Sequence, residues 1–114
     1  MTVYKKDHET TLAELREKIV AFTDARNWNE GHRAKNLAMS IAIEAAELME
    51  HFQWRDNADY TADKVEAEEK REIALECADV MIYMLSFCHR MGIDLAEAVQ
   101  EKLDINEKRF PAVK

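Results

Sequence analysis

Glycine and proline are scarce in this chain of 114 residues, which contains two glycines and one proline. No stretch is rich in glycine, serine or proline, so the sequence offers no segment that would serve as a linker between domains. No apolar run is long enough to cross a bilayer, and the N-terminal segment lacks the apolar core of a signal peptide. We expect one helix-rich domain, residues 1–114, without a membrane partner.

Positive charge is also in deficit. The formal net charge is -7 and the isoelectric point is near 5.1. No block of lysine and arginine interrupts this excess of acid, and such a chain repels the phosphate backbone of a nucleic acid polymer. A small phosphate compound remains compatible with the composition, because a bound divalent cation reverses the local field.

Cysteine is limited to Cys77 and Cys88, which lie eleven residues apart in one predicted helix. That separation corresponds to about 16 Å along a helix axis, too far for a disulfide between them. Reduced thiols are typical of a cytoplasmic protein, which is the location we predict.

Hydrophobic residues recur at helical spacing, and no strand-like alternation of useful length competes with that pattern. Three helix starts carry a capping-box pattern, and a glycine suits the end of the third helix: Thr11 with Glu14, Asp63 with Glu66, Asp94 with Glu97, and Gly92. The predicted helices cover residues 11–27, 36–54, 63–91 and 94–110. We expect an all-α, four-helix fold, and because a chain this short buries little surface alone, we expect subunit association to complete it.

Two of these helices contain long apolar runs, residues 37–49 and 73–88, in which very few positions are polar. The polar residues are Ser40, Glu44 and Glu47 in the first run, and Glu76, Asp79 and Ser86 in the second. A helix that is apolar all round is normally buried on most of its faces. The four acids are therefore predicted to point into the interior, whereas Glu66, Glu68, Glu69 and Glu72 lack that setting and are predicted to face solvent.

Within each run the two acids are three residues apart, so both project from the same side of their helix. Packing the two helices face to face brings four carboxylates together, and their repulsion is relieved by a cation. All-oxygen ligands favour Mg²⁺ or Mn²⁺, and Mg²⁺ commonly completes its shell with substrate phosphates. The alternative is a set of solvated or salt-bridged acids, which is the usual meaning of a single ExxE motif.

Two further sets of residues are candidates for ligand contacts. Lys102, Asn106 and Arg109 share one face of the last helix and would donate to phosphate oxygens, although this spacing is also typical of a solvated face. Aromatic faces stack on nucleobases, and the alternative role of such residues is core packing. The aromatic candidates are Trp28, His32, Trp54 and Tyr83.

The motifs ExxE, ExxD and a terminal KxDxNxxR together resemble the all-α NTP pyrophosphatase superfamily, and in particular its small single-domain MazG-like proteins. The resemblance covers about residues 12–111 and is strongest to the dCTP pyrophosphatase branch. The matching segments are Trp28, His32 and Asn36 with three residues between each, EHFQW at 50–54, DVMIY at 79–83 and KLDINEKRFP at 102–111.

The resemblance implies hydrolysis of a nucleoside triphosphate, with a dNTP such as dCTP favoured, to the monophosphate and pyrophosphate. This is a nucleotide-pool, house-cleaning activity of homodimers or homotetramers. The implied Mg²⁺ ligands are Glu44, Glu47, Glu76 and Asp79; the implied phosphate-binding residues are Lys102, Asn106 and Arg109; the implied base or sugar contacts are Trp54 and Tyr83, with Trp28, His32 and Asn36 nearby. The chain departs from many relatives at Ile43, where they carry a second glutamate, so the number of bound metals stays open.

Our mechanistic hypothesis is attack of water on the α-phosphorus in line with departing pyrophosphate, with Glu47 as general base. Enzymes of the same superfamily acting on dUTP or phosphoribosyl-ATP are alternatives. A di-iron bundle needs Glu-x-x-His pairs, and His51 follows Glu47 by four residues rather than three. A non-enzymatic helical interaction module, whose acids answer lysines or arginines of a partner, is the remaining alternative.

Overall fold

The computed structural model describes residues 2–113, which form helices joined by loops. The elements in chain order are the short 3-10 helix η1 (Asp7–Glu9), α1 (Leu12–Ala25), α2 (Ala34–Glu50), α3 (Ala67–Met91) and α4 (Leu95–Arg109). No strand occurs among these residues. The prediction of an all-α fold with four α-helices is therefore confirmed.

Two of the three predicted helix starts are confirmed by their hydrogen bonds. The Glu14 backbone N–H donates to Thr11 Oγ1 at 3.1 Å, and the Glu97 backbone N–H donates to Asp94 Oδ1 at 2.9 Å. These bonds satisfy amide groups that have no partner within the first helical turn. The predicted start of α3 at Asp63 is wrong, because the Asp63 carboxylate accepts the Thr61 hydroxyl in the loop and the helix begins at Ala67.

The helix ends follow from backbone conformation. α3 ends where Gly92 adopts φ 66°, and the Ile93 N–H then donates to the Cys88 carbonyl at 2.8 Å. α1 ends at Ala25, two residues before the predicted boundary, because Asn27 adopts φ 54°. α2 covers Ala34–Glu50 and not 36–54; its direction continues as turns, in which the Gln53 N–H donates to the Met49 carbonyl at 3.0 Å.

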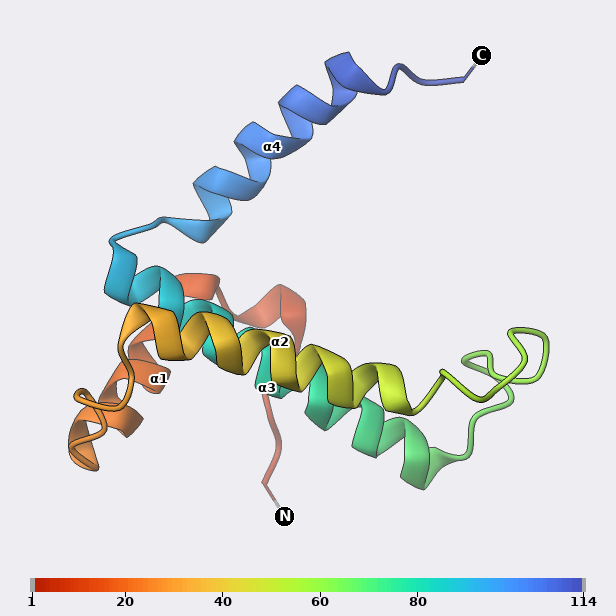
Figure 1. Cartoon of the computed structure of the whole chain (residues 1–114), viewed down its shortest axis with the longest axis horizontal. Coiled ribbons are helices and arrows are strands. Elements are labelled where there is room, and N and C mark those ends of the chain that lie inside the picture. The colour runs from red at the N-terminus through yellow and green to blue at the C-terminus, as the bar shows by residue number, and fades with distance from the viewer. Residues whose placement is uncertain (1, 114) are drawn as a thin grey trace.

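Helices α2 and α3 run side by side in opposite directions, and α1 lies against the part of α3 near its C-terminal end (Figure 1). Two arginines join α1 and its following loop to α3. Arg16 Nη2 donates to the Ile93 carbonyl at 2.6 Å, and Arg90 Nη2 donates to the Asn29 carbonyl at 2.9 Å. The side chains most deeply buried between these three helices are Leu37, Leu85 and Cys88.

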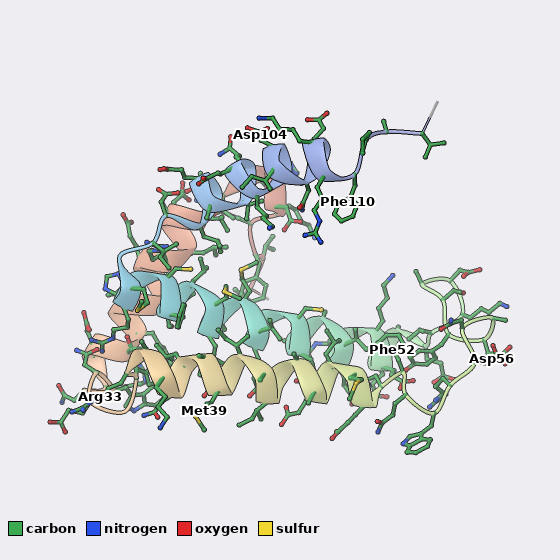
Figure 2. All side chains as sticks on the ribbon, turned by 45° about the horizontal axis from the view of Figure 1, so that its top comes forward. Arg33, Met39, Phe52, Asp56, Asp104 and Phe110 are labelled. Atoms are coloured by element: carbon green, nitrogen blue, oxygen red, sulfur yellow. The ribbon has the colours of Figure 1, made fainter. Side chains whose placement is uncertain are left out.

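Helix α4 projects away from the other three helices (Figure 1). Its apolar side chains remain uncovered: Leu103 is 61% exposed and Phe110, near the end of the helix in Figure 2, is 65% exposed. The radius of gyration is 16.9 Å, whereas a compact chain of this length has about 13 Å. The accessible surface is 9569 Å², compared with about 6,500 Å² for a folded monomer of this mass.

The apolar runs of α2 and α3 are only partly buried within one chain. Met39 on the side of α2 away from α3 is 54% exposed, and Leu75 on α3 is 51% exposed (Figure 2). The prediction that these runs are buried on most faces is wrong for the single chain, because α3 covers only part of α2, and α1 and α2 cover only part of α3. Apolar surface of this extent is typical of a protein–protein interface.

The two cysteines of α3 differ in exposure. Cys77 is exposed, Cys88 is buried, and both are free. None of the described helices combines the length with the apolar character that a bilayer crossing requires.

Leu85→Ala should lower the free energy of unfolding by about 2–5 kcal/mol, because it leaves a cavity between α1, α2 and α3. Urea unfolding followed by circular dichroism, at one fixed protein concentration, measures the change. Val113→Ala removes methyl groups from a side chain that is 99% exposed, and it should stay within about 0.5 kcal/mol of the parent protein. Equal effects of the two substitutions would contradict the position of the core.

Candidate metal and nucleotide site

Three carboxylates meet where α2 and α3 face each other. Glu44 and Glu47 come from α2 and Glu76 comes from α3, and one oxygen of each lies within 4.8 Å of the others. The spacing of three residues places Glu44 and Glu47 one helical turn apart on the side of α2 that meets α3. The helix pair thus concentrates negative charge in a small volume.

Burial of carboxylate oxygens costs free energy when no positive charge lies beside them. Glu44 Oε2 and Glu76 Oε2 are buried and have no hydrogen-bond partner within the described part of the chain. No lysine or arginine among residues 2–113 forms an ion pair with Glu44, Glu47 or Glu76. A buried, unpaired carboxylate oxygen costs free energy unless it is protonated or binds a cation.

The pKa values of two of these acids respond accordingly. Burial is the largest cause that raises the pKa of Glu44 from 4.5 to about 7, and the charges of Glu47, Asp79 and Glu76 add to it. Burial is also the main cause of the raised pKa of Glu76, followed by Glu47 and Asp79. Like charges in a partly desolvated place disfavour one another's ionised form, and a cation removes that conflict.

Asp79 stands beside this group rather than within it. Its charge raises the pKa of both Glu44 and Glu76, but its side chain lines a neighbouring cavity of about 450 Å³ between α1 and α3. The structure thus brings three of the four predicted metal ligands into one cluster and places the fourth at its edge.

The cavity beside Asp79 is lined mainly by apolar and aromatic side chains. The rings of Trp28 and His32 lie 5.7 Å apart, those of His32 and Tyr83 lie 6.3 Å apart, and Phe22 meets Trp28 edge to face at 5.4 Å. Its volume falls within the range of small-molecule pockets, and aromatic walls suit a planar heterocycle. Tyr83, which is distant in the sequence from Trp28 and His32, therefore shares one cavity with them.

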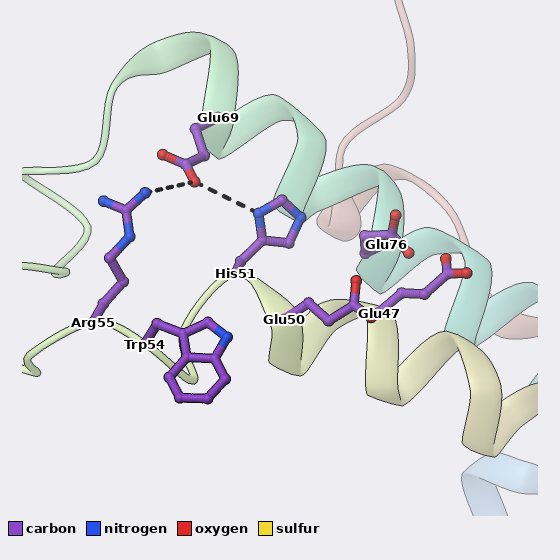
Figure 3. Close-up of a pocket in the computed structure, with 7 residues that line it drawn as sticks. All are labelled: Glu47, Glu50, His51, Trp54, Arg55, Glu69 and Glu76. Carbon is purple, nitrogen blue, oxygen red and sulfur yellow. Dashed lines mark ion pairs between the residues drawn. The ribbon is translucent and has the colours of Figure 1, made fainter.

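A second cavity, of about 560 Å³, opens on the other side of the acids (Figure 3). Glu47 and Glu76 contribute to its wall, so the acid cluster borders this cavity, whereas Asp79 at the edge of the cluster borders the aromatic one. Trp54 lies here, 87% exposed, and not in the cavity that contains Trp28. The remaining lining residues are Glu50, His51, Arg55 and Glu69.

Four predicted site residues lie away from both cavities. The Asn36 side-chain amide donates to the Gly31 carbonyl at 3.2 Å and stabilises the start of α2. Lys102, Asn106 and Arg109 are all on α4, and none of them lines either cavity of the described chain. Helix α4 points away from the acids, so one chain does not unite the acids with the expected phosphate clamp (Figure 1).

The structure adds residues that the sequence analysis did not single out. The prediction that Glu69 faces solvent is wrong: its side chain is 29% exposed and pairs with His51 at 3.6 Å and with Arg55 at 3.9 Å. The EAEEKRE segment gave no signal for this, because its partners are brought near only by the loop between α2 and α3. Phe22 of α1, which the sequence analysis also did not name, lines the aromatic cavity.

The fold and the site together define a helical protein with an acid cluster that fits a cation beside an aromatic cavity. The chain belongs to the MazG-like family, whose family model matches residues 39–114. It is similar to a pyrophosphatase of known crystal structure from Archaeoglobus fulgidus DSM 4304, with 38% identity, a TM-score of 0.81, and coverage of 98% of this chain and 100% of that one.

The chain is also similar to curated proteins that are named as pyrophosphatases. The chain is 34% identical over 104 residues to dCTP pyrophosphatase 1 of Homo sapiens, and 33% identical over 103 residues to dCTP pyrophosphatase 1 of Rattus norvegicus. These alignments cover 91% and 90% of this chain, respectively, but 61% of each relative. The chain therefore spans about three fifths of the length of the curated relatives it matches.

The raised pKa of Glu44 predicts how the metal-free protein responds to pH. Because the folded state holds a proton that the unfolded state releases above pH 4.5, the contribution of Glu44 to stability is lost as pH rises from 4.5 to about 7. In the presence of EDTA, the free energy of unfolding should therefore fall across this interval more steeply than in a Glu44→Gln variant. Parallel pH profiles of the two proteins in urea unfolding would contradict the clustering of the acids.

Proposed function

We propose that the protein is a Mg²⁺-dependent nucleoside triphosphate pyrophosphohydrolase that converts a dNTP to the monophosphate and pyrophosphate. The observation that carries the proposal is the meeting of Glu44, Glu47 and Glu76 beside the larger cavity, with Asp79 between this cluster and the aromatic cavity. Two of the carboxylate oxygens are buried and have no partner among residues 2–113. Carboxylate oxygens without nitrogen or sulfur ligands fit Mg²⁺, with Mn²⁺ as a substitute. The names of the curated relatives favour dCTP or a related nucleotide as the first substrate to test.

Different residues of the chain would bind the metal and the base of the nucleotide. Glu44, Glu47 and Glu76, with Asp79 at the edge, would hold the metal. A bound divalent cation offsets charge on the phosphates and lowers the pKa of water. The base would enter the aromatic cavity, where Trp28, His32 and Tyr83 present ring faces and edges.

Glu47 is the best placed general base of the cluster. It is exposed and lines the larger cavity, whereas Glu44 and Glu76 each keep one oxygen buried. A carboxylate with access to water is able to accept a proton from the attacking molecule. Water then adds to the α-phosphorus, the bond to the bridging oxygen breaks in line, and pyrophosphate leaves with the electron pair.

Incubation with each NTP and dNTP plus Mg²⁺ should yield the monophosphate and pyrophosphate, with a deoxynucleotide, dCTP first, turned over fastest. Glu47→Gln should lower kcat by at least about a hundredfold, since it removes the general base and a metal ligand. Ion-exchange chromatography of the products identifies the cleaved bond.

The same panel with phosphoribosyl-ATP added separates the related enzymes and the non-enzymatic alternative. Fastest turnover of dUTP or phosphoribosyl-ATP would assign the chain to another branch of the superfamily. A chain that turns over no nucleotide and gains no thermal stability from Mg²⁺ would instead be an interaction module, because ligand binding to a native site raises the melting temperature.

We infer that the acids of one chain are completed by α4 of a second copy. Lys102 and Arg109 lie on a helix that projects from its own subunit (Figure 1). The apolar side chains beside them, such as Leu103, are uncovered. The accessible surface of one chain exceeds that of a compact monomer by about 3,000 Å². Two chains therefore have about 6,000 Å² in excess, which is at the upper end of what interfaces of obligate homodimers bury. Free cysteines are compatible with a reducing cytoplasm, where we place this homodimer or homotetramer.

Mixed oligomers test whether α4 acts across the interface. Glu47→Gln and Arg109→Gln proteins should each be nearly inactive alone, and co-expressing them should restore activity to about a quarter of that of the parent, since one site in half of the symmetric dimers is intact. Lys108→Gln, which removes a neighbouring charge from α4, serves as the matched control and should stay active. Absence of any recovery in the mixed protein would show that α4 does not serve the neighbouring site.

A further inference from the structure

The segment after α2 is held in a defined position against α3. The Gln53 N–H donates to the Met49 carbonyl at 3.0 Å and the Arg55 N–H donates to the Phe52 carbonyl at 3.0 Å, so the backbone continues in turns beyond the helix. These hydrogen bonds fix the backbone position of Arg55 relative to the end of α2. Its side chain forms part of the wall of the larger cavity (Figure 3).

Glu69 on the first turn of α3 is the anchor of this segment. Its Oε1 lies 3.6 Å from His51 Nδ1 and 3.9 Å from Arg55 Nη2 (Figure 3). The Tyr60 hydroxyl is buried beside the same carboxylate; it makes no hydrogen bond of full geometry in the described structure, but its proximity is the largest cause that lowers the pKa of Glu69. One carboxylate thus attracts three groups of the loop.

The guanidinium of Arg55 is oriented from two sides. Glu69 attracts one of its nitrogens, and the ring of Tyr60 lies beneath its plane, with Cζ 4.9 Å from the ring centroid. Phe52 supports Tyr60 from the edge, at a centroid distance of 4.8 Å. An arginine has five N–H donors, and a single carboxylate at this distance leaves most of them available. The Arg55 side chain is 55% exposed, so those donors are accessible.

The wall of the larger cavity is mainly acidic. Four of its lining residues are glutamates, and Arg55 is the one lining residue of the described chain with a permanent positive charge. A triphosphate bound through a cation at Glu47 and Glu76 would extend several negative charges into this space, and Lys102 and Arg109 of α4 do not line it in the same chain. The pair with Glu69 involves one guanidinium nitrogen, so the other N–H donors of Arg55 remain free to bind a phosphate oxygen while Glu69 stays in place.

We propose that Arg55 binds a phosphate group of the substrate and that Glu69 is the positioning residue that orients it, an inference that rests on the proposed triphosphate substrate. Arg55 acts by direct charge-assisted hydrogen bonds from the subunit that holds the metal. Glu69 does not touch the substrate, and its effect on catalysis passes through the guanidinium.

Steady-state kinetics of single and double variants test both parts. Arg55→Gln should lower kcat/KM about tenfold or more, mainly through KM, and should raise the inhibition constant of inorganic tripolyphosphate, which has no base to stack, by a similar factor. Arg55→Lys should restore part of the loss. Glu69→Gln should raise KM several-fold in the parent protein but should have no further effect in the Arg55→Gln background.

Arg71→Gln and Glu68→Gln are matched controls, since both residues are exposed on the same stretch of α3 and line neither cavity. An unchanged KM in Arg55→Gln, or an undiminished effect of Glu69→Gln without Arg55, would overturn the proposal, because a merely structural anchor acts independently of Arg55. If the parent protein hydrolyses no nucleotide, the proposed function fails as well; if it is active, only the role of Arg55 and Glu69 fails.

Discussion

Repulsion among buried carboxylates at the contact between α2 and α3 is the constraint on which the site depends. These helices form the most extensive helix pair of the described chain, and their contact has Leu37 and Leu85 in its core and Glu44, Glu47 and Glu76 farther along. Close packing fixes the acids in place, so the molecule is unable to separate them without losing apolar contact. Negative charge is thereby built into the helix pair, and a cation is the simple way to stabilise it.

Local sequence signals predicted the parts of the structure that depend on neighbouring residues. Thr11 and Asp94 cap their helices as expected, because the hydrogen bond involved spans three residues. The spacing of Glu44 and Glu47 within an apolar run similarly predicted which side of α2 meets α3. Helical periodicity carries this information, since it relates side-chain direction to position in the chain.

Features that depend on distant residues were not predictable in the same way. Glu69 meets His51 and Arg55 only because a loop returns the chain across the end of the helix pair. The direction of α4 depends on the short connection after Gly92, where one left-handed residue turns the chain away from α3. The pattern in α4 shows an apolar face but does not state which surface covers it, and among the described residues of one chain its side chains stay largely exposed.

Helix α3 fixes the distance between two parts of the site. One uninterrupted helix carries Glu76 of the acid cluster and Tyr83 of the aromatic cavity, seven residues apart. At the rise of an α-helix this separation is about 10 Å, and a regular helix keeps it when a compound binds. Helix α3 therefore sets the distance between the acid cluster and Tyr83. A compound that contacts both must match that distance, and a shorter compound reaches only one of them.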